Sequence, residues 1–137
     1  MIFWAGVETY IDAYPALTRV RKLVEPFLNS ALLKSGLADL NGKLRYIPIA
    51  MPANMLSRYP ARSKFSAKKR IYDCSPVLDY GVFVNGTFDA QIEEYLRGIE
   101  LAAPYLVKLG ANEEQIAEFI TILAMAKGIG RISSKMH

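Results

Sequence analysis

The chain has 137 residues, of which 52% are hydrophobic and 22% are charged. This composition is typical of one globular domain with a core and argues against a disordered chain. The 17 Lys and Arg residues exceed the 13 Asp and Glu residues, and no apolar run is long enough to cross a bilayer, so we expect no membrane partner. The only cysteine, Cys74, cannot form an internal disulfide and suits a reducing compartment, which favours a cytoplasmic protein.

The first part of the chain predicts a strand followed by a long helix. Residues 2–10 are rich in β-branched and aromatic side chains and are apolar on both faces, as in a buried strand. Between residues 16 and 32, apolar side chains recur at helical spacing. Pro26 is expected to kink this helix, and Gly36 is expected to end it.

Two more strands separated by a loop are predicted in the middle of the chain. Residues 43–51 form the second strand, in which Pro48 favours an edge position or a bulge because proline cannot donate to the ladder. The prolines within residues 52–67 indicate an irregular loop. The third strand covers about residues 68–78.

The last part of the chain predicts two helices. Thr87 or Asp89 caps the first of them, and Gly110 closes it. Asn112, with Gln115 three residues later, resembles a capping box at the start of the second.

The predicted order of elements is therefore β-α-β-β-α-α, in one domain that spans residues 1–137 with a loose tail at about 131–137. Such an order indicates an α+β fold. We expect a small, mainly antiparallel sheet of about three strands, with the helices packed on one face.

The positive charge of the chain is concentrated in residues 58–70. This segment holds six of the 17 basic residues and no acidic one, which leaves 11 basic against 13 acidic residues elsewhere. Concentrated charge of one sign can capture an acidic partner. The residues of interest are the six basic ones and two aromatics: Arg58, Tyr59, Arg62, Lys64, Phe65, Lys68, Lys69 and Arg70.

Three interpretations of this basic segment compete. It is a solvated loop and edge strand in which Lys prevents strand pairing, a protein-recognition surface, or a site for RNA or DNA. Arg and Tyr are favoured anchors of protein interfaces, whereas the sequence contains no recognised nucleic-acid-binding module. Nucleic acid is therefore the less favoured partner.

The residues needed for most catalytic and metal sites are missing from the sequence. His137 is the only histidine and Cys74 the only cysteine, so neither a catalytic triad nor a zinc site can be assembled. The nearby Lys69 and Arg70 would lower the pKa of Cys74, but a small apolar residue on a strand is the more favoured interpretation. The fragment Gly128-Ile129-Gly130 follows a helix, the wrong context for a dinucleotide site. We expect no enzymatic activity, no metal and no cofactor.

The order and spacing of several short motifs also resemble a known family. They are the opening Phe3-Trp4-Ala5-Gly6-Val7-Glu8, the stretch Tyr46-Ile47-Pro48-Ile49-Ala50-Met51, Tyr59-Pro60 before the basic run, and Asp73 on the next strand. Over about residues 2–107 the chain resembles the immunity protein 44 family of bacterial polymorphic-toxin systems. Ala5 stands where the family has a bulkier aliphatic residue, and the region after Asn85 diverges.

The resemblance implies a non-catalytic protein that binds a cognate toxin and neutralises it by stoichiometric occlusion. We expect the eight residues of the basic segment to face the toxin, with an acidic patch as the natural complement. Glu8 and Arg45 form a second polar candidate site, and Trp4 is expected to pack in the core. The alternative is a small nucleic-acid-binding protein that uses the same segment. The sequence leaves the oligomeric state open.

Overall fold

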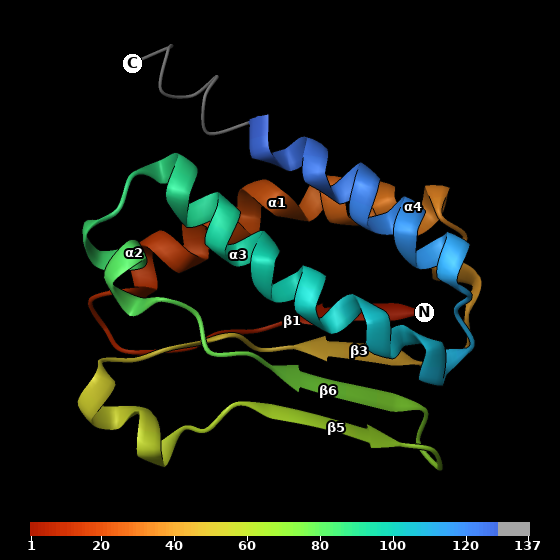
Figure 1. Cartoon of the computed structure of the whole chain (residues 1–137), viewed down its shortest axis with the longest axis horizontal. Coiled ribbons are helices and arrows are strands. Elements are labelled where there is room, and N and C mark those ends of the chain that lie inside the picture. Colours follow the sequence, from red (N-terminus) through yellow and green to blue (C-terminus); the bar gives the residue numbers. More distant parts are fainter. Residues whose placement is uncertain (129–137) are drawn as a thin grey trace.

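The computed structural model describes residues 1–128, so the expected tail at 131–137, the sole histidine and most of the Gly128-Ile129-Gly130 fragment lie outside the described residues. A four-stranded sheet in the order β1-β3-β6-β5 lies beneath a layer of helices (Figure 1). Its strands are β1 (Ile2–Ala5), β3 (Lys43–Tyr46), β6 (Ile71–Ser75) and β5 (Arg62–Ser66). The helices are α1 (Tyr14–Lys34), α2 (Tyr80–Asn85), α3 (Phe88–Ala102) and α4 (Glu113–Leu123).

Short elements connect these larger ones. β2 (Glu8–Thr9) and β4 (Ile49–Ala50) pair with each other as a parallel two-stranded sheet. Four 3₁₀ helices complete the described chain: η1 (Leu37–Asp39), η2 (Ala53–Arg58), η3 (Ala103–Leu109) and η4 (Ala124–Lys127).

The α+β class is confirmed, but the expected sheet of about three mainly antiparallel strands is wrong. Pairs β1–β3 and β3–β6 are parallel, and only the β5–β6 hairpin is antiparallel. The reason lies in the connections: α1 carries the chain back between β1 and β3, and η2 with β5 carries it back between β3 and β6. A chain that returns to its starting edge before the next strand produces a parallel pair.

The expected boundaries of the strands also need correction. The strand expected at residues 2–10 is divided into β1 and β2, and the one expected at 43–51 is divided into β3 and β4. Pro48 lies in the second gap, where the missing N–H costs no ladder bond. The loop expected at 52–67 contains η2 and all of β5, because the alternation of β5 is weak and four of its five residues are basic or serine.

Most helix signals in the sequence are confirmed. Gly36 follows α1 with a φ of 79°, Thr87 caps α3 by accepting from the Ala90 N–H, and Asn112 and Gln115 form the capping box of α4. α1 continues through Pro26 to Lys34. The six-residue helix α2 has no counterpart in the predicted order.

The core lies between the helices and one face of the sheet. Tyr46 of the central strand β3 is fully buried there, donates a hydrogen bond of 3.1 Å to the Tyr95 carbonyl oxygen, and meets the Tyr95 ring edge-on at 5.5 Å. Gly98 on α3 sits directly over this pair. A methyl group at position 98 would overlap the Tyr46 hydroxyl oxygen and lie 2.9 Å from Leu78 Cδ2.

We therefore expect Gly98→Ala to destabilise the protein. Alanine favours an exposed helix by about 1 kcal/mol, but overpacking of a filled core costs about 1–3 kcal/mol and here also disturbs the Tyr46 hydrogen bond. The free energy of unfolding, measured with urea, should fall accordingly. Gly128→Ala is the matched control, because no heavy atom lies within 4 Å of a Cβ placed there, and it should be neutral. Equal stability of the two variants would contradict this packing.

A carboxylate ties the start of α2 to α3. Glu94 Oε2 accepts from the Asp79 N–H at 2.6 Å, and the two Glu94 oxygens accept from Arg97 Nε and Nη2 at 2.6 and 2.8 Å. The side chain of Glu94 is 12% exposed. Burial by itself would raise the pKa of Glu94, but the hydrogen bonds from Arg97 and Asp79 hold it below the ordinary value.

This network predicts a loss of stability in acid. Because the pKa of Glu94 is lower in the folded state than in the unfolded chain, its carboxylate stabilises the fold above the unfolded pKa of about 4.3. That contribution disappears as the pH falls through the folded-state pKa. Glu94→Gln should lose about 1–3 kcal/mol at pH 7 and depend less on pH below about pH 5 in urea titrations. The exposed Glu118→Gln is the control, and a similar loss there would argue against the network.

Candidate interaction surface on the open sheet face

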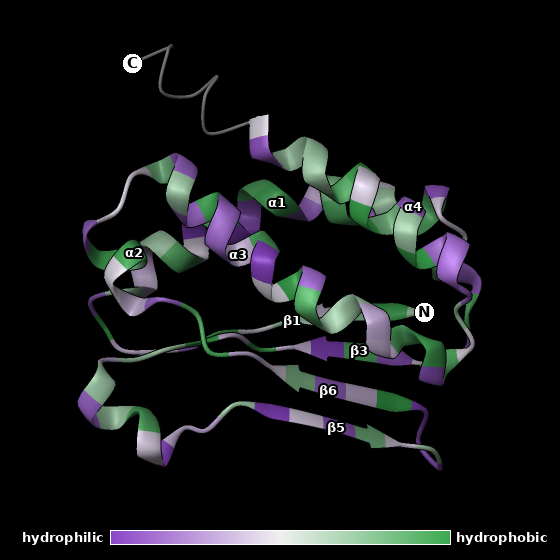
Figure 2. Ribbon diagram, in the orientation of Figure 1, coloured by the Kyte–Doolittle hydropathy of each residue, from purple (hydrophilic) through white to green (hydrophobic). Residues whose placement is uncertain are grey.

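One face of the four-stranded sheet is not covered by any described helix. The register places alternate residues of all four strands on this face, which we call the open face: Ile2, Trp4, Lys43, Arg45, Arg62, Lys64, Ser66, Ile71, Asp73 and Ser75. Their neighbours along the strands, such as Leu44 and Tyr72, are buried under the helices. Figure 2 shows this alternation most clearly along β3, where purple and green segments follow one another.

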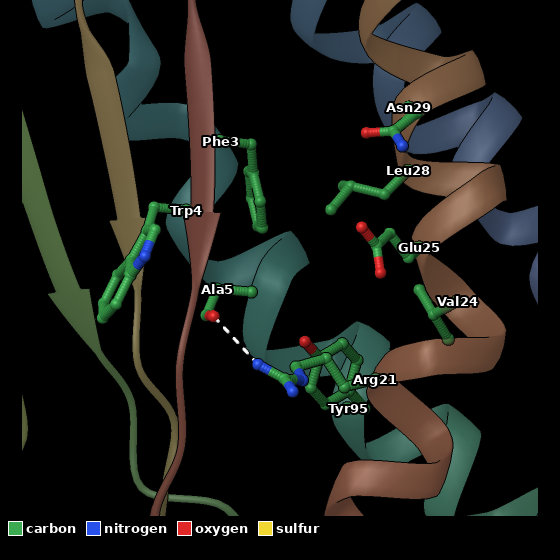
Figure 3. Close-up of a pocket in the computed structure, with 9 residues that line it drawn as sticks. All are labelled: Phe3, Trp4, Ala5, Arg21, Val24, Glu25, Leu28, Asn29 and Tyr95. Carbon is green, nitrogen blue, oxygen red and sulfur yellow. Dashed lines mark hydrogen bonds between the residues drawn. The ribbon is translucent and has the colours of Figure 1, made fainter.

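Trp4 is the largest side chain on the open face, and it is 43% exposed. The expectation that it packs in the core is therefore wrong, because its register with Arg45 turns it away from the helices (Figure 3). Arg45 Cζ lies 5.4 Å and Lys43 Nζ 5.8 Å from the centroid of its ring. A Cβ on Gly6 would lie 3.1 Å from the ring, so this glycine permits the close approach of the indole to the backbone.

Two ion pairs cross the open face. Arg45 Nε lies 3.3 Å from Asp73 Oδ1 on the neighbouring strand, and Arg62 Nη2 lies 2.6 Å from Glu8 Oε2. Arg62 also donates to Ser75 Oγ at 3.2 Å. The expected pairing of Glu8 with Arg45 is thus wrong: each finds a different partner, and both pairs belong to the same face. Exposed pairs of this kind contribute little to stability and remain available to a partner.

The structure divides the basic segment into three parts. Arg62 and Lys64 lie on the open face, and Lys68 and Lys69 are exposed in the turn after β5. Arg58 ends η2 and is also exposed, with Tyr59 half-buried next to it. The segment therefore follows the outer edge of the sheet.

Phe65 and Arg70 are used by the fold. The register turns Phe65 to the helix side, where it packs against the core and Lys108 Nζ lies 5.9 Å from its ring centroid. Arg70 has a φ of 51° and donates to the Asn41 and Leu109 carbonyl oxygens at 2.8 and 3.0 Å. It joins two loops and is not directed at the open face.

Sequence reasoning missed Trp4 and Lys43 as surface residues and treated Arg45 as secondary. The signal was the alternation in Lys43-Leu44-Arg45-Tyr46, which indicates a strand with one polar face. The corresponding alternation in residues 2–5 is hidden, because both the exposed and the buried side chains there are apolar.

A second feature lies on the opposite side of β1, between that strand and α1. A cavity of about 260 Å³ is lined there by Phe3, Val24, Leu28, Tyr95 and polar residues of α1 (Figure 3). Arg21 lines this cavity, and its Nη1 donates to the Ala5 carbonyl oxygen at 3.1 Å. Trp4 and Ala5 of β1 complete the lining.

Within residues 1–128, no cluster of His, Cys, Asp and Glu could hold a metal ion, and no helix has the length and apolar character to cross a membrane. Cys74 is buried beneath the helices on β6, and this burial raises the pKa of its thiol. The basic residues that the sequence places nearby do not reverse this effect.

We expect Cys74 to react slowly with thiol reagents in the folded protein. A buried thiol with a raised pKa contains little thiolate at pH 7.5, and thiolate is the reacting form. Alkylation by iodoacetamide, followed by mass spectrometry, should be at least about 100-fold slower in buffer than in denaturant. The unfolded chain is its own control, and comparable rates in the two conditions would show that the thiol is accessible.

Searches of protein-family models, of curated proteins and of solved structures find no match to this chain.

Proposed function

We propose that this protein is a cytoplasmic, non-catalytic immunity protein, which binds a cognate bacterial toxin with its open face and neutralises it by stoichiometric occlusion. The resemblance of its sequence motifs to those of the immunity protein 44 family supports the choice of partner. The proposed contact surface is the open face, with Arg62 and Lys64 of the basic segment at its outer side.

The observation that carries the proposal is the exposed Trp4, held against the sheet beneath Arg45 and Lys43. Tryptophan and arginine are the residues most enriched among the energetic anchors of protein interfaces. Ile2, which is 66% exposed, extends the apolar area along β1. An apolar strip bordered by charged side chains has the anatomy of a recognition site.

The charge pattern favours a protein over nucleic acid. An aromatic ring among basic residues on a sheet is also a platform on which single-stranded bases can stack, which makes nucleic acid the second candidate. On the open face, however, Asp73 pairs with Arg45 and Glu8 pairs with Arg62. Phosphates would have to displace both carboxylates, whereas a toxin with mixed charges can extend the same pairs.

We expect substitutions on the open face to weaken binding and protection. Trp4→Ala removes the anchor and should weaken toxin binding by about 30-fold, and Lys64→Glu should weaken it by about tenfold. Lys34→Glu makes the same charge change at the exposed end of α1 and should have no effect. The toxin is first captured from nuclease-treated lysate of the native cell and identified by mass spectrometry. Survival of cells that co-express toxin and variant then reports protection.

The outcomes separate the two candidates. A folded Trp4→Ala, Lys64→Glu double variant that still protects would refute binding through the open face. Loss of all captured material on nuclease treatment would instead favour nucleic acid. In that case the affinity for a labelled single-stranded oligonucleotide should fall steeply with added salt, because bound phosphates release counterions.

A further inference from the structure

The outer edge of β1 is paired with no strand of the described chain, and the hydrogen bond from Arg21 to the Ala5 oxygen is the only one that residues 1–128 make with it on that side. The N–H groups of Ile2, Gly6 and Glu8 donate inward, to the carbonyl oxygens of Gly42, Tyr46 and Pro48. Because backbone groups alternate in direction along a strand, those of Phe3, Ala5 and Val7 point outward. No strand of the described chain pairs with this side of β1, and the contact from Arg21 to the Ala5 oxygen confirms the direction.

The two edges of the sheet differ in their protection against pairing. β5, at the other edge, carries Arg62 and Lys64 and is followed by Lys68 and Lys69, and charged side chains of this kind prevent strand addition. β1 consists of the four uncharged residues Ile2–Ala5. An unprotected edge of this composition is a template for another strand.

Polar side chains of α1 lie along the same edge. Arg21, Glu25 and Asn29 recur every four residues and so form one stripe on the helix. Figure 3 shows them directed toward the space beside β1, with Ala5 level with the interval between Arg21 and Glu25. Glu25 is exposed and makes no salt bridge with any residue among 1–128.

We propose that the occupant of this edge is a second copy of the same chain, paired with β1 in antiparallel orientation about a two-fold axis at Ala5. Ala5 then faces Ala5 of the second copy, and Phe3 faces Val7, so all the outward backbone groups of the segment find partners. The result is one sheet that continues through both copies. The small side chain of Ala5 permits close approach at the axis.

Charge complementarity supports this occupant. A two-fold axis reverses the order of the α1 stripe, so Arg21 of one copy lies beside Glu25 of the other, and the reciprocal pair forms as well. Arg21 can keep its bond to Ala5, because a carbonyl oxygen accepts two hydrogen bonds. An arbitrary strand would not supply these two charges, whereas a second copy does.

The proposal does not rest on the toxin-binding function. The open face and the edge of β1 are perpendicular surfaces, so dimerisation leaves Lys43, Arg45 and Lys64 accessible. A monomeric protein could still bind toxin, and a dimer could exist without any toxin.

Sedimentation velocity of the purified chain over about 1–200 µM tests the dimer, with dissociation expected in the micromolar range. The single tryptophan, which lies next to the axis, provides a second signal. Its emission should change on dilution with the same midpoint as the sedimentation coefficient. A protein that stays monomeric at the highest concentration would overturn the proposal.

Charge reversals test the mode of pairing. Glu25→Arg and Arg21→Glu should each weaken the homodimer by roughly tenfold or more, because like charges then meet twice at the axis. An equimolar mixture of the two variants should form a heterodimer again, since every Arg then faces a Glu. A general structural role of either residue would not produce this rescue. Two folded variants that dimerise as the wild type does, or whose mixture stays monomeric, would overturn the proposed pairing.

Two further variants complete the experiment. Glu118→Arg makes the same charge reversal on exposed α4 and should leave dimerisation unchanged. Ala5→Pro removes an outward N–H and should abolish the dimer, with circular dichroism confirming that the monomer is folded. Wild-type dimerisation by a folded Ala5→Pro variant would show that the β1 edge is not the interface.

Discussion

The helices of the described chain pack on a single face of the sheet, and this constraint determines the role of every side chain on the strands. Tyr46 and Gly98 hold the two layers together: the tyrosine fills the space that the missing glycine side chain leaves, and its hydroxyl bonds to the backbone of α3. Once one face is filled in this way, the alternate residues must face solvent. Trp4, Arg45 and Asp73 therefore share one surface although they are distant in sequence.

The elements that the sequence predicts well are those with local physical causes. The end of α1 at Gly36 and the capping box at Asn112 depend on backbone dihedrals and side-chain bonds within a few residues. The pairing of the strands depends on how connections return across the sheet, which local patterns do not contain. The order of elements does contain part of this information: a helix between two strands returns the chain to its starting edge, so the predicted β-α-β order already favoured the parallel β1–β3 pair that the antiparallel expectation overlooked.

The surface residues were harder to assign than the core for a similar reason. Trp4 is apolar, and burial is the common fate of a tryptophan in an apolar strand. Its exposure follows from the register of β1. Phe3 faces the helices, and because successive side chains of a strand alternate between the two faces, Trp4 lies on the open face. The charge of residues 58–70 was visible in the sequence, but its division was not. The side chain of Arg70 is held by hydrogen bonds to two loops, whereas Lys64 lies on the open face.

The two edges of the sheet differ in the charge of their side chains, and this difference allows the open face and the β1 edge to bind different partners. At β5 the basic side chains repel an added strand, so contact there must be made through side chains on the face. At β1 the side chains are uncharged, and the free groups are those of the backbone, which recognise another strand whatever its sequence. Selectivity at that edge must therefore come from outside the strand. Arg21 and Glu25 provide it from α1, because only a partner with the reversed order of charges satisfies both.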